Sequence, residues 1–200
     1  MKKLLSLFVL SLSLIAGAAL ANISDAESLV RQTSSEVLDV MKKEKNDKKL
    51  RELIEQKVLP SFDFTRMTGL AVGKDWRAAS DAQKAQLTEE FKTLLVRTYS
   101  ATLTSYKVQA IDVKPVKADA AATDVTVNTD VAVAGQQPVA INYKLRKAEQ
   151  GWKVYDVIVG GVSLVTNYRG TFGETVKQSG IDGLIKSLKD KNAAVPAGKA

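Results

Sequence analysis

The stretch from Val157 to Arg169 reads VIVGGVSLVTNYR, and it indicates the class of fold. It begins with β-branched residues, passes two adjacent glycines and continues with apolar residues at helical spacing. This pattern predicts a strand that turns at Gly160 and Gly161 and leads directly into a helix. Ser163 stands where the N-cap of that helix is expected. A strand and a helix joined so closely share one apolar interior, so we expect an α+β protein.

The residues before this stretch alternate between apolar and polar, which is typical of half-buried strands. The first alternating series contains Val125, Val127, Val131 and Val133, and the second contains Val139, Ile141, Tyr143 and Leu145. A turn containing Gly135 separates them. The run from Trp152 to Val159 is apolar on both faces apart from Lys153 and Asp156, as expected for a strand covered on both sides. The region from Tyr106 to Val159 therefore predicts a curved antiparallel sheet of about four strands.

Helical patterns occupy the first half of the chain. Ser24 and Glu27 form a potential capping box for a helix over residues 24–45, and a second amphipathic segment ends at Pro60. Short helical structure is expected over residues 63–71. Ser80 and Gln83 form another capping box, which predicts a long helix with one apolar face: Leu87, Phe91, Leu94, Leu95, Thr98, Tyr99 and Thr102. The predicted fold is a sheet packed against several helices.

The N-terminus has the features of a secretory signal peptide. Lys2 and Lys3 precede an apolar run from Leu4 to Leu20, and Ala19-Leu20-Ala21 fits a cleavage site. A permanent membrane anchor is the alternative, but the run is interrupted by serines and is short for a spanning helix. We expect a cleaved signal over residues 1–21, a single α+β domain over 22–192 and a disordered tail over 193–200.

Composition excludes several kinds of chemistry. The chain has no histidine and no cysteine, which excludes histidine acid/base catalysis, thiol nucleophiles, disulfides and nearly every zinc or copper site. The formal net charge is +7, but Lys and Arg are interleaved with acidic residues, so nucleic-acid binding is not predicted. The basic residues form either a solvated surface or an attraction to anionic headgroups or acidic partners. Asp63 and Asp156 lie in apolar context, where a helix N-cap and a paired strand acid are expected.

Two blocks of the sequence carry a family resemblance. The first spans Pro60 to Ser100 and the second spans Gly151 to Arg169, extended to Phe172. The residues that carry the resemblance are Phe62, Phe64, Met67, Trp76, Gln83, Phe91, Leu94, Leu95 and Tyr99, then Trp152, Asp156, Gly161, Ser163, Asn167, Tyr168, Arg169 and Phe172. With them the chain resembles the MlaC family, also known as the toluene-tolerance auxiliary protein family, the periplasmic phospholipid-binding component of the Mla intermembrane lipid-transport system.

The resemblance implies a soluble periplasmic carrier and no enzyme. Such a protein holds a glycerophospholipid by its acyl chains in a deep apolar cavity and needs no cofactor or metal, because the lipid is its cargo. It acts as a monomer between an outer-membrane lipoprotein–porin complex and an inner-membrane ABC transporter complex, and so maintains the lipid asymmetry of the outer membrane. Small residues are expected to leave the space for the lipid: Ala71, Val72, Val127, Val131, Val162 and Val165.

We expect the lipid-contacting residues to come from both blocks and from the strands. They are Phe64, Met67, Leu70, Val72, Leu94, Leu95, Tyr99, Leu103, Tyr106, Val127, Ile141, Tyr143, Val162, Val165 and Tyr168. Two alternatives remain open from the sequence. One is an enzyme on a cone-shaped α+β scaffold that acts on a small apolar substrate through Asp156 with Tyr143 or Tyr155. The other is a periplasmic adaptor with a filled core and no ligand.

Overall fold

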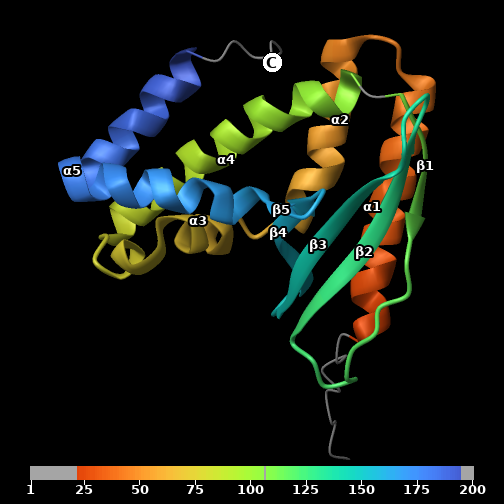
Figure 1. Cartoon of the computed structure of the whole chain (residues 1–200), viewed down its shortest axis with the longest axis horizontal. Coiled ribbons are helices and arrows are strands. Elements are labelled where there is room, and N and C mark those ends of the chain that lie inside the picture. Colours follow the sequence, from red (N-terminus) through yellow and green to blue (C-terminus); the bar gives the residue numbers. More distant parts are fainter. Residues whose placement is uncertain (1–21, 106, 195–200) are drawn as a thin grey trace, which may run out of the picture.

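The computed structural model describes residues 22–105 and 107–194, with the backbone alone at residues 47 and 100–105 (Figure 1). The expected signal peptide and Tyr106 lie outside the described residues. The helices are α1 (Ile23–Lys43), α2 (Asp47–Val58), α3 (Phe64–Val72), α4 (Asp81–Ser105) and α5 (Leu164–Ala194), with short 3₁₀ helices η1 (Leu59–Ser61) and η2 (Gly73–Arg77). None of the described helices combines the length and apolar character needed to span a membrane.

Local capping interactions fix where the helices begin. Asp63 caps α3 by accepting the backbone N–H of Arg66 at 2.8 Å, and Ser80 and Gln83 form the capping box that was expected before α4. The capping box predicted for α1 was wrong by two residues, because Asn22 is the N-cap and Asp25 accepts the Asn22 N–H at 2.6 Å. Ser24, which was expected to be the N-cap, therefore lies inside the first turn of α1.

The strands form one antiparallel sheet in the order β1-β2-β3-β4-β5. They are β1 (Val108–Val113), β2 (Asp124–Val133), β3 (Val139–Ala148), β4 (Gly151–Val159) and β5 (Val162–Ser163). The α+β class and the antiparallel sheet are confirmed, with a fifth strand of only two residues. Irregular register in β1 and between Lys144 and Leu145 of β3 bends the sheet, since a bulge increases local twist.

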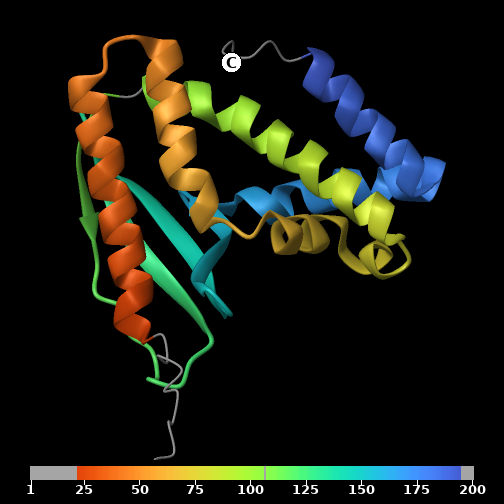
Figure 2. The ribbon, with the colours of Figure 1, turned by 180° about the vertical axis from the view of Figure 1, so that it is seen from behind.

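Two hydrophobic cores lie at opposite sides of the molecule. The helical core joins α3, α4 and α5 and consists of Met67, Ala71, Val72, Leu87, Phe91, Leu94, Leu95, Val165, Phe172, Leu184, Ile185 and Leu188. The sheet core joins α1 to the strands and consists of Ala26, Val30, Val113, Val125, Val127, Leu145, Trp152, Val154 and Val157. Phe62, between η1 and α3, packs against both cores. Figure 2 shows α1 lying along the sheet while α3, α4 and α5 extend away from it.

The long helix α5 changes direction at Gly180, where φ is +70° and ψ is −176°. The second half then packs along α4, where the Asn192 amide donates to the Glu90 carbonyl at 2.9 Å and the Gln83 amide donates to Asp182 at 2.8 Å. Helix α5 includes Ala193 and Ala194, two residues of the expected tail, because alanine favours helix and Asn192 is anchored. Residues 195–200 lie outside the described residues.

Candidate functional site

The inner face of the sheet is covered unevenly. Helix α1 packs against β1, β2 and β4, and the inward residues of β2 are buried: Val125, Val127, Thr129, Val131 and Val133. Their partners along β3 have the same inward direction, because directly paired residues of antiparallel strands point to one face. Yet Val139, Ile141 and Tyr143 are only half-buried, and Val159 of β4 is exposed. We call these four residues the open apolar face.

Helix α5 begins next to this face and leads from it to the helical core. Leu164 packs against the sheet core, and Tyr168, one turn later on the same side of α5, packs against the helical core. The Tyr168 ring also makes edge-on contact with Phe91, at 5.1 Å between centroids. The Tyr168 hydroxyl interacts with Tyr99 of α4. The first turns of α5 therefore connect the open apolar face to the helices.

The two tyrosines of this region are uncharged at neutral pH. Burial raises the pKa of Tyr143 to about 12, although its side chain remains partly accessible. Burial, with a smaller contribution from the nearby Tyr99, raises the pKa of Tyr168 to about 12. Desolvation penalises the phenolate and leaves the neutral phenol, which is compatible with apolar neighbours. A ligand in this region meets an apolar surface with a few neutral hydroxyl groups.

Asp156 has a structural role on the opposite face of β4. Its carboxylate is 3% exposed and accepts the Ser163 hydroxyl at 2.8 Å, and the Lys144 ammonium lies at 4.0 Å. Ser163 in turn caps α5 by accepting the Thr166 N–H at 3.0 Å. Asp156 is paired with Lys144, and Tyr143 is paired with Val157, so Asp156 and Tyr143 point to opposite faces. Asp156 and Tyr143 therefore do not form the catalytic pair that the enzyme alternative requires.

Tyr155, the other tyrosine considered for catalysis, belongs to a surface cluster. The Arg66 guanidinium lies over its ring at 4.6 Å from the centroid, and Arg66 and Asp124 form an ion pair at 3.7 Å. Burial, followed by the charge of Asp124, raises the pKa of Tyr155. These contacts fix α3 against the outer side of the sheet and give Tyr155 a packing role.

The structure divides the expected lipid-contacting residues into four groups. Met67, Val72, Leu94, Leu95 and Val165 are buried in the helical core, and Val127 is buried in the sheet core. Phe64, Tyr99, Tyr168, Ile141 and Tyr143 are half-buried at the edges of these cores. Leu70 and Val162 are exposed. For Leu103 only the backbone is described, and Tyr106 lies outside the described residues.

Burial also separates the small residues that were expected to leave space for a ligand. Ala71, Val72, Val127, Val131 and Val165 are buried, and Val162 alone among them is exposed. Among the expected lipid-contacting residues that adjoin a core, the half-buried ones therefore combine apolar neighbours with surface that a ligand can reach. Sequence reasoning missed Val139, Val159 and Leu164 as site residues. The alternation of β3 and the position of Val159 two residues after Val157 were the available signals for the first two.

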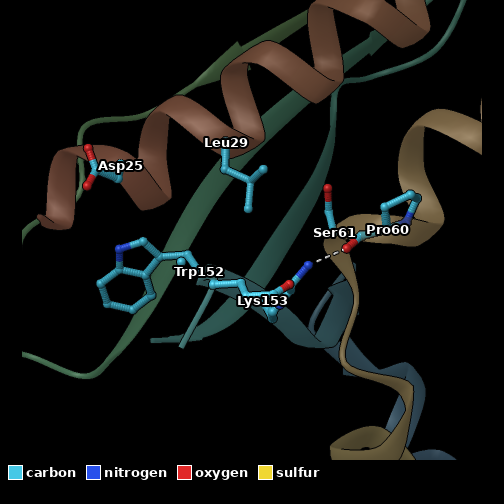
Figure 3. A pocket seen from close by; sticks show the side chains of 8 residues that line it. Asp25, Leu29, Pro60, Ser61, Trp152 and Lys153 are labelled. Carbon is cyan, nitrogen blue, oxygen red and sulfur yellow. Dashed lines mark hydrogen bonds between the residues drawn. The ribbon is translucent and has the colours of Figure 1, made fainter. Parts of the chain in front are cut away.

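Two pockets lie outside the open apolar face. One, of about 410 Å³, lies between the start of α1, η1 and the turn from β3 to β4, and Figure 3 shows Trp152 and Lys153 beside it. Lys153 donates to the Pro60 carbonyl at 2.6 Å. The other, of about 510 Å³, lies between α2, η1, α3 and α4, and Phe64 is the one expected lipid-contacting residue that lines it. Within the described ranges 22–105 and 107–194, no group of acidic side chains is arranged to hold a metal ion.

Comparison with known proteins identifies the family. The model of the family described as MlaC protein matches residues 31–190, which include both conspicuous blocks of the sequence. This chain belongs to the MlaC family. The family resemblance noted in the sequence is confirmed.

Two named proteins are similar to this chain. The chain is 23% identical over 189 residues to the intermembrane phospholipid transport system binding protein MlaC of Haemophilus influenzae, covering 91% of this chain and 88% of that protein. It is 30% identical over 108 residues to the toluene tolerance protein ttg2D of Pseudomonas putida, covering 53% of this chain and 49% of that protein. Neither relative is named as an enzyme.

A solved structure supports the same assignment. It is a phospholipid-binding protein from Ralstonia solanacearum in complex with a phospholipid. The match has a TM-score of 0.77 and 35% sequence identity and covers 85% of this chain and 98% of that one. The shared fold extends over nearly all of the solved chain.

Proposed function

We propose that this protein is a periplasmic phospholipid carrier that holds the acyl chains of its cargo against the open apolar face. The observation that carries this proposal is that Ile141 and Tyr143 stay half-buried beside fully buried neighbours on the same face of the sheet. The phospholipid bound by the related Ralstonia protein supports the same ligand class. In this proposal Leu164, Tyr168 and Tyr99, which are half-buried at the core edges, supply further apolar contacts for the lipid.

The energetics favour a carrier that retains its lipid. Burial of an acyl chain contributes about 0.8 kcal/mol per methylene, so two chains of about fifteen carbons each give a cost on the order of 20 kcal/mol for release into water. Spontaneous escape into the aqueous phase is negligible at that cost. Release therefore requires an acceptor that offers an apolar path, which makes a shuttle between membrane-bound partners the natural role.

In this proposal the partners are the inner-membrane ABC transporter complex and the outer-membrane lipoprotein–porin complex of the Mla system. The name of the Haemophilus relative, which describes intermembrane phospholipid transport, supports this assignment. The signal-peptide pattern of residues 1–21 supports export to the periplasm. The carrier acts as a monomer, and its contribution is to move phospholipid and thereby maintain outer-membrane lipid asymmetry.

Native mass spectrometry of protein exported to the periplasm tests the binding step. We expect a stoichiometric adduct with the mass of a diacyl phospholipid, identified after organic extraction. A bare polypeptide mass would contradict the proposal and favour an adaptor without a ligand.

A pair of neighbouring substitutions locates the lipid. Ile141→Asp places a carboxylate on the open apolar face and is expected to abolish the adduct, because a charge beside acyl chains is poorly solvated. Asn142→Asp introduces the same charge one residue later, on the opposite face of β3, and is expected to retain the lipid. Far-UV circular dichroism checks that both variants fold. Equal lipid content in two folded variants would place the lipid elsewhere.

A further inference from the structure

A row of paired residues crosses the sheet from its interior to its surface. Thr129 of β2 pairs with Ile141 of β3, Ile141 pairs with Val159 of β4, and Val159 pairs with Val162 of β5. All four side chains therefore point to the inner face. The exposed fraction rises along the row, from 1% at Thr129 through half-buried Ile141 to 36% at Val159 and 57% at Val162.

The end of this row is unusual for the surface of the molecule. Over the described part of the chain the large exposed apolar residues are Leu70, Val159 and Val162. Two of these three lie opposite one another across a single hairpin, where β4 ends beside the start of α5 (Figure 1). Single exposed apolar residues are common, but these two valines are paired and continue the open apolar face to the edge of the sheet.

The hairpin is held in a fixed position. Gly160 and Gly161 have φ values of +55° and +87°, and positive φ at both central residues is the requirement of a tight two-residue turn that fits sheet twist. The Gly160 N–H donates to the Ala140 carbonyl of β3 at 3.0 Å. On the far side, Ser163 is fixed by Asp156. The two valines are therefore presented by a rigid support.

We propose that the row Ile141–Val159–Val162 is the path along which an acyl chain enters and leaves the binding site. This inference rests on the proposed function, because it names the route to the same site. Each methylene that crosses the edge of the sheet exchanges one apolar contact for the next along the row. Val162, as the outermost residue, shields the chain from water at the point where no other part of the sheet covers it.

The role differs from that of a residue that holds bound lipid. Val162 lies outside the open apolar face, so its substitution changes the free energy of the crossing chain and leaves the bound state unaltered. Association and dissociation rates then change by one common factor. If a polar residue replaces Val162, about two methylenes of the crossing chain are exposed to water, and both rates fall about ten-fold. The equilibrium dissociation constant stays the same.

Stopped-flow fluorescence with delipidated protein tests this prediction. The probe is a phosphatidylethanolamine with one short acyl chain carrying an environment-sensitive fluorophore. For Val162→Asp we expect association and dissociation both to slow about ten-fold at an unchanged dissociation constant. Val162→Ile keeps an apolar β-branched side chain and is expected to retain the wild-type rates. Thr166→Asp adds the same charge at an exposed position in the first turn of α5 and serves as the charge control.

Three results would overturn the path or the function, and they are distinguishable. Unchanged rates for Val162→Asp at wild-type stability, measured by thermal denaturation, would refute the path while leaving the carrier function intact. Weaker binding through faster dissociation alone would show that Val162 contacts bound lipid instead. Failure of every protein, wild type included, to bind the probe would refute the proposed function itself.

Discussion

The contact between Asp156 and Ser163 holds the start of α5 against β4, and its removal gives a quantitative prediction. Ser163→Ala removes a hydrogen bond to a charged and buried carboxylate, worth about 2 kcal/mol, and also the N-cap of α5, worth about 1 kcal/mol. We therefore expect the free energy of unfolding to fall by about 3 kcal/mol. Asp156→Ala is expected to cost a similar amount, because it leaves the Ser163 hydroxyl and the Val165 N–H without this acceptor.

The variant with both substitutions measures the interaction between Asp156 and Ser163 separately from the other contributions of each residue. Because both single variants lose the same hydrogen bond, we expect the double variant to be less destabilised than the sum by about 2 kcal/mol. Urea denaturation followed by circular dichroism measures all three proteins. Thr175→Ala removes another hydroxyl of α5, one that bonds only to the Thr171 carbonyl of its own helix, and should change stability by less than about 0.5 kcal/mol. A coupling free energy below about 0.5 kcal/mol would refute the argument.

Three further predictions concern the core, the tyrosines and the N-terminus. Val165→Glu buries a charge in the helical core at a cost comparable with the whole stability of a domain, so no folded protein is expected by circular dichroism, and a folded variant would place Val165 outside the core. Because the pKa of Tyr143 and Tyr168 is about 12 in the folded state against 10 ordinarily, the folded state retains protons that the unfolded state loses, and stability should fall as pH rises from 10 to 12. Tyr143→Phe should weaken this dependence in urea denaturation at graded pH, and an unchanged slope would show that Tyr143 does not contribute. The exported protein should begin at Asn22 by intact mass, whereas retention of residues 1–21 would contradict signal cleavage.

The sequence predicted those parts of the fold that depend on local patterns. The long helix α4 was predicted with its capping box because Ser80 and Gln83 lie next to a clear apolar face. The strands β2 and β3 were predicted because one of their faces is buried, which requires alternation. Strand β5 was not predicted, because two residues are too few to show the alternation of apolar and polar side chains. The start of α1 was misplaced because Ser24 and Glu27 fit the same capping pattern as Asn22 and Asp25.

The candidate site was less predictable, because burial depends on packing between distant segments. Val165 and Ile141 are both apolar residues in amphipathic segments, and nothing local separates the one that fills a core from the one that stays half-buried. The difference arises because α1 covers β1 and β2 and leaves part of β3 uncovered. Asp156 was correctly expected as a paired strand acid, since a buried carboxylate needs donors.

The separation of the two cores has a mechanical consequence. The two cores consist of different elements, and Phe62, the start of α5 and Tyr155 of β4 pack between them. Helix α2 also contacts both α1 and α4. Because each interior lies within its own set of elements, a small change in the spacing between the sheet and the helices leaves both interiors buried. We expect such a molecule to adjust the distance between the sheet and the helical core to acyl chains of different length or number.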